Sequence, residues 1–219
     1  MTDSDFDGAL IAGAFRVAAE EGWRKVSVVS AARAAGLPLP EARARFPARV
    51  AILLRFGRMA DQAALMGAEA EGPVRDRLFD LLMRRFDALQ QHRAGVLALM
   101  HALPSDPPAA AMLACATRRS MRWMLQAAGV SASGLRGEMQ IRGLMAVWLW
   151  ALRAWTRDET SDMSATMVAL DNALARADQA AGWVFGRRAP PPPASTEGGS
   201  EPGETPSPDD SEMGDPAEI

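Results

Sequence analysis

Apolar side chains recur at three- and four-residue spacing along most of this chain, and that spacing restricts it to a helical fold. Leu10, Ala14 and Ala18 form one such stripe, and residues 163–174 contain another. Tyr is absent and β-branched residues are sparse, whereas the helix-favouring residues Ala, Leu, Met and Arg dominate. The sequence therefore predicts an all-α fold without strands.

Glycine and proline residues divide this pattern into separate helices. Gly22 can end the first helix, Gly36 can take the positive φ of a tight turn, and proline is tolerated in the first turn of a helix. The helices expected from these signals cover residues 7–21, 28–35, 39–46, 48–66, 73–91, 93–102, 107–127, 135–155 and a last helix to about residue 185, capped by Ser161 or Asp162.

Residues 189–219 differ in composition from the rest of the chain. They contain eight prolines and eight acidic residues but no Lys or Arg. Such a segment cannot bury enough apolar surface to offset its ordering entropy, so we expect a disordered acidic tail. Residues 1–188 carry 24 basic and 19 acidic side chains, so this part is mildly basic although the whole chain has a net charge of −3.

Three features bear on the cellular compartment. The single cysteine, Cys115, excludes an internal disulfide and fits a reducing environment. The acidic N-terminus lacks the basic and then apolar pattern of a signal peptide. The longest strongly apolar run, residues 144–152, has about half the length that a bilayer crossing needs. We therefore expect a soluble cytoplasmic protein without a transmembrane segment.

Residues 26–46 have the spacing of a helix-turn-helix motif. Ala32 is a small residue where the two short helices would cross, Gly36 allows the turn, and Leu37 can fill the core after it. Between residues 23 and 58 the chain carries eight basic residues and one acid. This charge suits the phosphates of double-stranded DNA. A solvated arginine-rich surface on an ordinary three-helix bundle would explain the charge equally well.

Residues 9–60 resemble the N-terminal domain of TetR-family transcriptional regulators. The segments that carry the resemblance are Ala9-Leu10-Ile11, Glu20-Glu21-Gly22-Trp23, Ser27-Val28, Ala34-Ala35-Gly36-Leu37 and Phe46-Pro47-Ala48-Arg49. The resemblance implies a TetR-like fold. It comprises a three-helix DNA-binding domain over residues 1–48, a connecting helix to about residue 66, and a helical ligand-binding and dimerisation domain over residues 49–188.

The same resemblance implies which residues meet DNA. It places Ser27 and Arg49 near phosphates and the start of the 39–46 helix near bases. TetR recognition helices usually carry small polar residues early and then a Leu-Tyr pair, whereas this chain has Arg43 at the Tyr position. The residues that we expect to contact DNA are Lys25, Ser27, Arg33, Leu39, Glu41, Arg43, Arg45 and Arg49.

The remainder of the chain shows no catalytic constellation. His92 and His101 lie nine residues apart, which is not metal-ligand spacing on one helix face. We interpret Cys115 as a small buried hydrophobe, and Asp158 and Glu159 as solvated charges in a turn. We therefore expect no enzymatic activity, no cofactor and no metal.

Met and Trp are concentrated in residues 112–155, which indicates either a core with a dimer seam or a pocket for an apolar ligand. The expected pocket residues are Met121, Trp123, Leu125, Met145, Trp148 and Leu149. The last two long helices are more apolar than a monomer could cover, and in TetR relatives they form the interface of a homodimer. The expected interface residues are Trp150, Met163, Met167, Leu170 and Leu174.

The second half also resembles the lipid-binding accessory family of coenzyme Q biosynthesis, which has a TetR-type fold. Residues 122–129, 140–148 and 155–162 carry this resemblance. Two functions follow. The first is a DNA-binding transcriptional regulator controlled by an apolar small molecule. The alternative is a lipid-binding accessory protein of ubiquinone (coenzyme Q) biosynthesis, which would explain the Trp and Met content but would leave the basic face without a purpose.

Overall fold

The computed structural model describes residues 2–67 and 71–185, with side chains up to residue 180. Within these residues the chain is helical and contains no strand, as predicted. The expected tail, residues 189–219, and the end of the domain expected over residues 49–188 lie outside the described residues. No helix in the described part is both long enough and apolar enough to span a bilayer.

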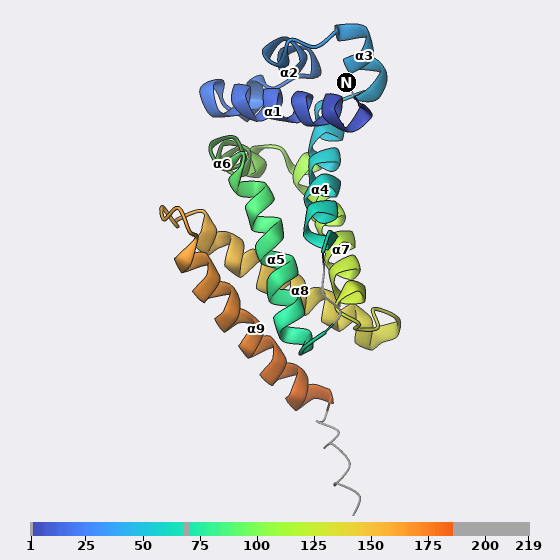
Figure 1. Ribbon diagram of the computed structural model, residues 1–219, viewed down its shortest axis with the longest axis vertical. Coiled ribbons are helices and arrows are strands. Elements are labelled where there is room, and N and C mark those ends of the chain that lie inside the picture. The colour runs from blue at the N-terminus through green and yellow to red at the C-terminus, as the bar shows by residue number, and fades with distance from the viewer. Residues whose placement is uncertain (1, 68–70, 186–219) are drawn as a thin grey trace, which may run out of the picture. The chain divides into compact units, whose positions relative to one another are not determined.

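Two groups of helices are joined by one long helix (Figure 1). The first group contains α1, α2 and α3. Helix α4 runs from it toward the second group, which contains α5, α7, α8 and α9. Helix α6 contacts α1. The α-helices are α1 Asp3–Glu21, α2 Val28–Ala35, α3 Leu39–Arg45, α4 Arg49–Leu65, α5 Val74–Gln90, α6 Arg93–Ala102, α7 Pro107–Ala127, α8 Gly134–Trp155 and α9 Ser164–Phe185, with 3-10 helices η1 Trp23–Lys25 and η2 Leu103–Ser105.

Helix starts differ from the expected ones where a side chain caps the backbone. Helix α1 begins four residues earlier than predicted because Thr2 Oγ1 accepts a hydrogen bond from the Asp5 amide, and the Asp5 carboxylate accepts one from the Thr2 amide. Helix α9 begins later than predicted. Asp162 lies outside it and accepts a hydrogen bond from the Ser164 amide at 3.2 Å.

Helix α1 lies at the centre of the first group because glycine lets its neighbours approach closely. A Cβ atom at Gly13 would lie 2.4 Å from the carbonyl oxygen of Ala31 in α2. A Cβ atom at Gly95 in α6 would lie 2.4 Å from the carbonyl oxygen of Phe15 in α1. Backbones therefore meet directly on two sides of α1, which fixes α2 on one side and α6 on the other.

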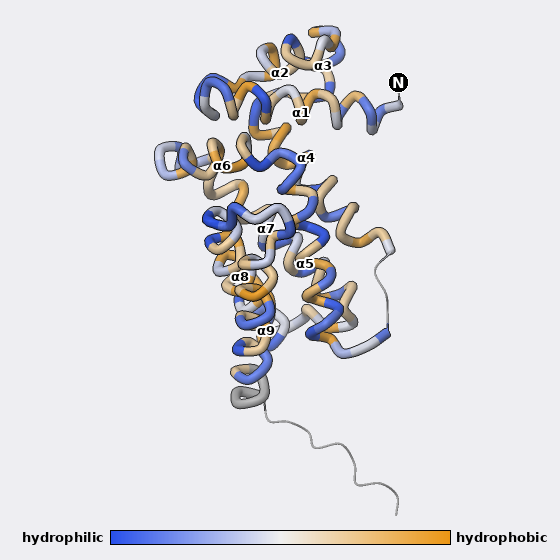
Figure 2. The backbone as a smooth tube through the Cα atoms, turned by 60° about the vertical axis from the view of Figure 1, so that its left-hand side comes forward, coloured by the Kyte–Doolittle hydropathy of each residue, from blue (hydrophilic) through white to orange (hydrophobic). Residues whose placement is uncertain are grey.

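The second group has a core that joins α5, α8 and α9. Phe86 and Trp148 stack with ring centroids 4.5 Å apart, and the Trp155 indole N–H donates to Gln90 Oε1 at 2.9 Å. Leu170 of α9 is fully buried against this core. Hydrophobic and hydrophilic residues alternate along the helices in Figure 2, as expected for helices with one buried face.

Candidate nucleic-acid interface and apolar cavity

Helices α2 and α3 and the turn between them have the predicted helix-turn-helix arrangement. Ser27 caps α2, since its hydroxyl accepts from the Ser30 amide while the Ser30 hydroxyl accepts from the Ser27 amide. Gly36 ends α2 with a φ of 66°, in the left-handed region that favours glycine. Leu37 then donates its amide to the Ala32 carbonyl at 2.8 Å, which closes the turn. Local capping and one glycine therefore fix how α3 leaves α2.

Exposed basic side chains lie within this motif and in the segments before and after it. The Arg43 side chain is exposed, and its guanidinium donates a hydrogen bond to the Pro47 carbonyl at 2.7 Å. The exposed basic residues of the predicted module are Arg24, Lys25, Arg33, Arg43 and Arg58. These side chains are accessible to an anionic partner.

The outward surface of α3 carries few groups that could read bases. Ala42 is buried against the module, whereas Leu39 and Glu41 are exposed. Of the α3 side chains that could hydrogen-bond a base edge, Glu41 and Arg43 are exposed, and Arg45 is engaged elsewhere.

Arg45 points back to α1 rather than away from the module. Its guanidinium donates to Asp7 at 2.9 Å and to Asp3 at 2.7 Å, and hydrogen bonds to Asp3 and Asp7 raise its pKa further above the ordinary value. Asp7 is buried and also accepts from Arg55 of α4 at 2.6 Å. Arg45 was expected to contact DNA. Its ion pair with Asp7 could not be foreseen, because Asp7 lies 38 residues away in the sequence.

Arg49 also has a partner within the chain. It begins α4, and its guanidinium lies 2.5 Å from Asp106 Oδ2. Asp106 in turn caps α7, because its Oδ1 accepts from the Ala109 amide at 3.2 Å. Arg49 therefore connects the start of α4, next to the helix-turn-helix motif, to the second group of helices.

The residues expected to form a pocket do not gather around one cavity. Met121 and Trp148 are buried in packing, and Met145 is partly buried against the core. Trp123 and Leu149 are 58% and 55% exposed. Met and Trp content indicated an apolar region, but it could not tell which faces of α7 and α8 point inward.

A charged cluster that the sequence analysis missed lies beneath Trp148. The Arg85 guanidinium lies 2.6 Å from the Asp61 carboxylate, and the Ser120 hydroxyl donates to the same carboxylate at 2.5 Å. Arg85 also lies over the Trp148 ring, 4.8 Å from its centroid. Burial lowers the pKa of Arg85 and raises that of Asp61. The three polar residues come from α4, α5 and α7, so their spacing in the sequence could not predict that they form a cluster.

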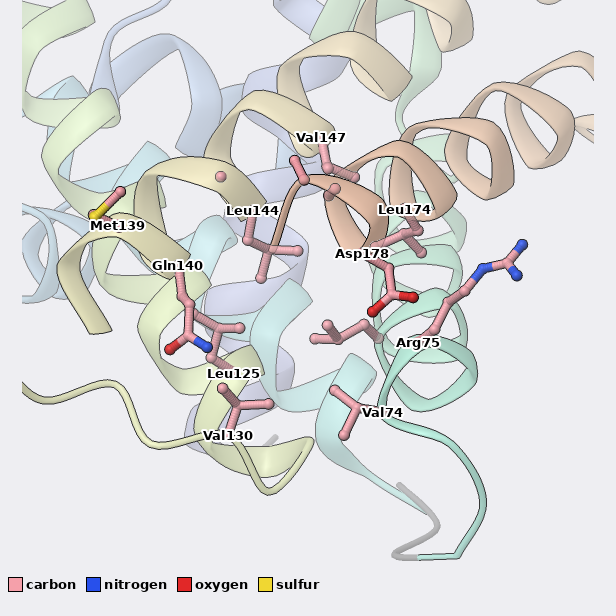
Figure 3. A pocket seen from close by; sticks show the side chains of 14 residues that line it. Val74, Arg75, Leu125, Val130, Met139, Gln140, Leu144, Val147, Leu174 and Asp178 are labelled. Atoms are coloured by element: carbon pink, nitrogen blue, oxygen red, sulfur yellow. The ribbon is translucent and has the colours of Figure 1, made fainter. Parts of the chain in front are cut away.

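A cavity of about 320 Å³ opens between α5, α7, α8 and α9. Figure 3 shows Leu144 and Leu125 on one side of it and Val74, Leu174 and Asp178 on the other. Leu125 is the one expected pocket residue that lines it, since the lining comprises Val74, Arg75, Leu78, Leu125, Val130, Met139, Gln140, Gly143, Leu144, Val147, Leu174, Ala177, Asp178 and Ala180.

Most residues expected at a dimer interface serve the core of this chain. Met163, Leu170 and Leu174 are buried, and Met167 is partly buried. Trp150 on α8 is 56% exposed and remains free to meet a second copy. The apolar residues at three- and four-residue spacing in α9 therefore pack mainly within this chain.

Two polar residues lie differently from their interpretation. Cys115 is exposed, not buried, because the neighbouring face of α7 turns away from the core. Asp158 is buried, not solvated, and accepts four hydrogen bonds from the amides and hydroxyls of Thr160 and Thr166. These bonds tie the end of α8 to the start of α9.

The histidines show no sign of metal binding. His92 stacks on Phe15 with ring centroids 5.2 Å apart, and burial lowers its pKa. Within the described residues, no group of three or more His, Cys, Asp or Glu side chains could hold a metal ion.

Several solved structures have a fold similar to that of this chain, whereas no family model and no curated protein matches its sequence. A TetR transcriptional regulator from Nitrosomonas europaea ATCC 19718 is 22% identical with a TM-score of 0.65, and the match covers 80% of this chain and 99% of that one. A TetR-family regulator from Streptomyces coelicolor is 20% identical with a TM-score of 0.55, over 84% of this chain and 85% of that one. A TetR regulator from Rhodococcus sp. RHA1 is 17% identical with a TM-score of 0.54, over 80% and 97%. The chain therefore has the fold of the TetR-family transcriptional regulators.

Proposed function

We propose that this protein is a DNA-binding transcriptional regulator of the TetR type. The observation that carries the proposal is the helix pair α2 and α3, joined at Gly36 and carrying exposed basic side chains on and next to it, in a fold similar to that of TetR regulators. In this arrangement α3 enters the major groove while residues around it hold phosphates.

The contacts divide into phosphate and base contacts. Lys25 and Arg33 would bind phosphates, and Ser27 would bring the N-terminus of α2 to a phosphate, because unpaired amides there favour an anion. Leu39, Glu41 and Arg43 would face the bases. Arg45, held by Asp7, would position α3 rather than read DNA.

The regulator would act as a homodimer through α8 and α9. Leu149 and Trp150 on α8 and Val168 on α9 are each more than half exposed. Exposed large apolar side chains of this kind mark association surfaces, and a two-fold pair would bury the same patch on both copies. Such a dimer would place its two copies of α3 about 34 Å apart, one turn of DNA.

A small ligand in the cavity would control DNA binding. The cavity is lined mainly by apolar side chains and lies in the group of helices that α4 joins to the basic module. A ligand that bound one dimer spacing more tightly than the other would shift the population between them.

One observation favours the alternative, a lipid-binding accessory protein of ubiquinone biosynthesis. The exposed residues of α3 include Leu39, Pro40 and Ala44, which cannot hydrogen-bond a base edge. In that case the cavity would carry the function, and the basic face would meet anionic lipid or a partner enzyme.

An electrophoretic mobility shift titration against DNA upstream of the protein's own gene separates the two functions. The regulator predicts a specific complex that Arg43→Ala weakens, while Arg153→Ala, a change of an exposed arginine on α8, leaves it intact. A protein that binds this DNA no better than random duplex, and that co-purifies with a quinone by mass spectrometry, would favour the accessory role.

A further inference from the structure

We propose that the cavity binds an uncharged amphiphile with a hydroxyl group, such as a medium-chain alcohol or an alkyl phenol. This inference rests on the ligand control proposed above, but the binding that it asserts is measured without DNA. The volume of about 320 Å³ lies at the lower end of the range for small-molecule sites, so the ligand is small.

The body of the ligand would be apolar. Leu78 of α5, Leu125 of α7, and Leu144 and Val147 of α8 line the cavity. All four side chains belong to the buried core, so this wall of the cavity is already formed without a ligand. An apolar chain in contact with it would gain the usual stabilisation from removing apolar surface from water.

Gly143 keeps one wall of the cavity open. It lies inside α8, where glycine is less stable than alanine by about 1 kcal/mol. Close packing does not require glycine there, because a Cβ atom added at Gly143 would meet nothing within 4 Å. At Gly137 of the same helix, in contrast, a Cβ atom would lie 2.3 Å from backbone. Gly143 lines the cavity, so the missing side chain leaves that wall unobstructed.

Gln140 supplies a polar group with no partner in this protein. It lines the cavity one helical turn before Gly143, and its Oε1 atom is buried without a hydrogen bond. A buried polar atom without a partner is costly, so its presence in an apolar lining indicates a partner that arrives with the ligand. The amide oxygen and nitrogen can exchange places by rotation, and a hydroxyl can pair with either because it both donates and accepts.

The charges around the cavity argue against an acidic ligand. The guanidinium of Arg75 lies 2.5 Å from Asp171, so its charge is already compensated. Asp178 supplies a carboxylate to the lining, on the same side as Arg75, as Figure 3 shows. A fatty acid would bring a second carboxylate toward Asp178, whereas an alcohol would bring no charge.

Isothermal titration calorimetry of the full chain with 1-octanol and with octanoate tests the inference. We expect 1-octanol to bind at least tenfold more tightly than octanoate. Gln140→Leu should weaken 1-octanol binding about tenfold through the lost hydrogen bond, and it should raise the Tm of the ligand-free protein because it removes the orphaned polar atom. Gly143→Leu should abolish binding by filling the cavity, and Gly143→Ala is the matched control that should retain it.

Several results would overturn the inference. One is that wild-type protein binds no 1-octanol, and another is that octanoate binds as tightly. A third is that Gln140→Leu binds 1-octanol unchanged, or that it lowers the Tm of the ligand-free protein, since Gln140 would then have a structural partner. If the protein binds 1-octanol but not DNA, this inference holds and the proposed regulatory function is wrong. If it binds DNA but not 1-octanol, the proposed function holds and this inference is wrong.

Discussion

Arg49, the first residue of α4, is paired with Asp106, the residue that caps α7, at 2.5 Å. The pair joins the helix that follows α3 to a helix of the second group. Because Arg49 is also a residue that would approach a DNA phosphate, Asp106 and DNA would compete for one guanidinium.

Replacing Asp106 should strengthen DNA binding. In Asp106→Ala the cap of α7 is lost, so we expect the free energy of unfolding to fall by about 1 kcal/mol in urea titrations. In Asp106→Asn the amide oxygen can still cap α7, so stability should change little. Both variants free Arg49, and fluorescence anisotropy should show tighter binding to duplex DNA. Unchanged affinity in the Asn variant would show that Arg49 does not reach a phosphate.

Asp7→Ala should destabilise the protein by about 3 kcal/mol, because Arg45 and Arg55 would both lose a buried partner. Urea unfolding followed by circular dichroism measures the loss. The matched control is Asp3→Ala, whose side chain is 91% exposed and whose removal should cost less than about 1 kcal/mol. Equal losses in the two variants would contradict a central role for Asp7.

Asp158 should make stability depend on pH in the acid range. Burial alone would raise its pKa, but hydrogen bonds from Thr160 and Thr166 outweigh this effect and lower the pKa from 3.8 to about 2. The folded state therefore favours the carboxylate, and this stabilisation is complete above the ordinary pKa and is lost as the pH falls from about 4 to about 2. The difference in unfolding free energy between wild type and Asp158→Asn should shrink across that window. A difference that stays constant from pH 5 to pH 2 would contradict the assignment.

Trp150→Glu should prevent formation of the proposed homodimer and leave a monomer. Trp150 is 56% exposed on α8, so a charge there would not disturb the core but would be buried in a two-fold interface. Size-exclusion chromatography with light scattering measures the mass. Met66→Glu changes a residue that is 74% exposed beyond the end of α4, and it should leave the mass unchanged. A Trp150→Glu protein that remains dimeric would place the interface elsewhere.

Local sequence signals predicted most of the helices. Gly36 and the capping serine Ser27 fixed α2 to within a residue, and the prolines at 107 and 108 fixed the start of α7. These signals work because capping and positive φ depend on neighbours in the chain. Helix α9 began later than predicted because Asp162 and the Met163 backbone, with a φ of 55°, form a turn that its sequence does not distinguish from a first helical turn.

The functional surfaces were harder to predict because they depend on contacts between distant residues. Arg45 was expected to contact DNA, but its partner Asp7 lies on another helix. Trp148 was expected in a pocket because Trp and Met are concentrated in residues 112–155, yet it stacks on Phe86 of α5. The residues that characterise the cavity are Gly143, which leaves open space, and Gln140, whose Oε1 atom is buried without a hydrogen bond. Both properties depend on how α8 packs against its neighbours, so the sequence alone does not show them.

The most direct test of DNA binding is the dependence of affinity on salt concentration. Duplex DNA affinity should fall linearly on a logarithmic plot against salt, and each lost phosphate contact should reduce the slope by about 1. We predict that Lys25→Ala combined with Arg33→Ala lowers the slope by about 2, whereas Arg153→Ala leaves it unchanged. No measurable DNA binding, or a slope that the double variant does not alter, would contradict the claim that the exposed basic side chains on and near α2 and α3 bind DNA.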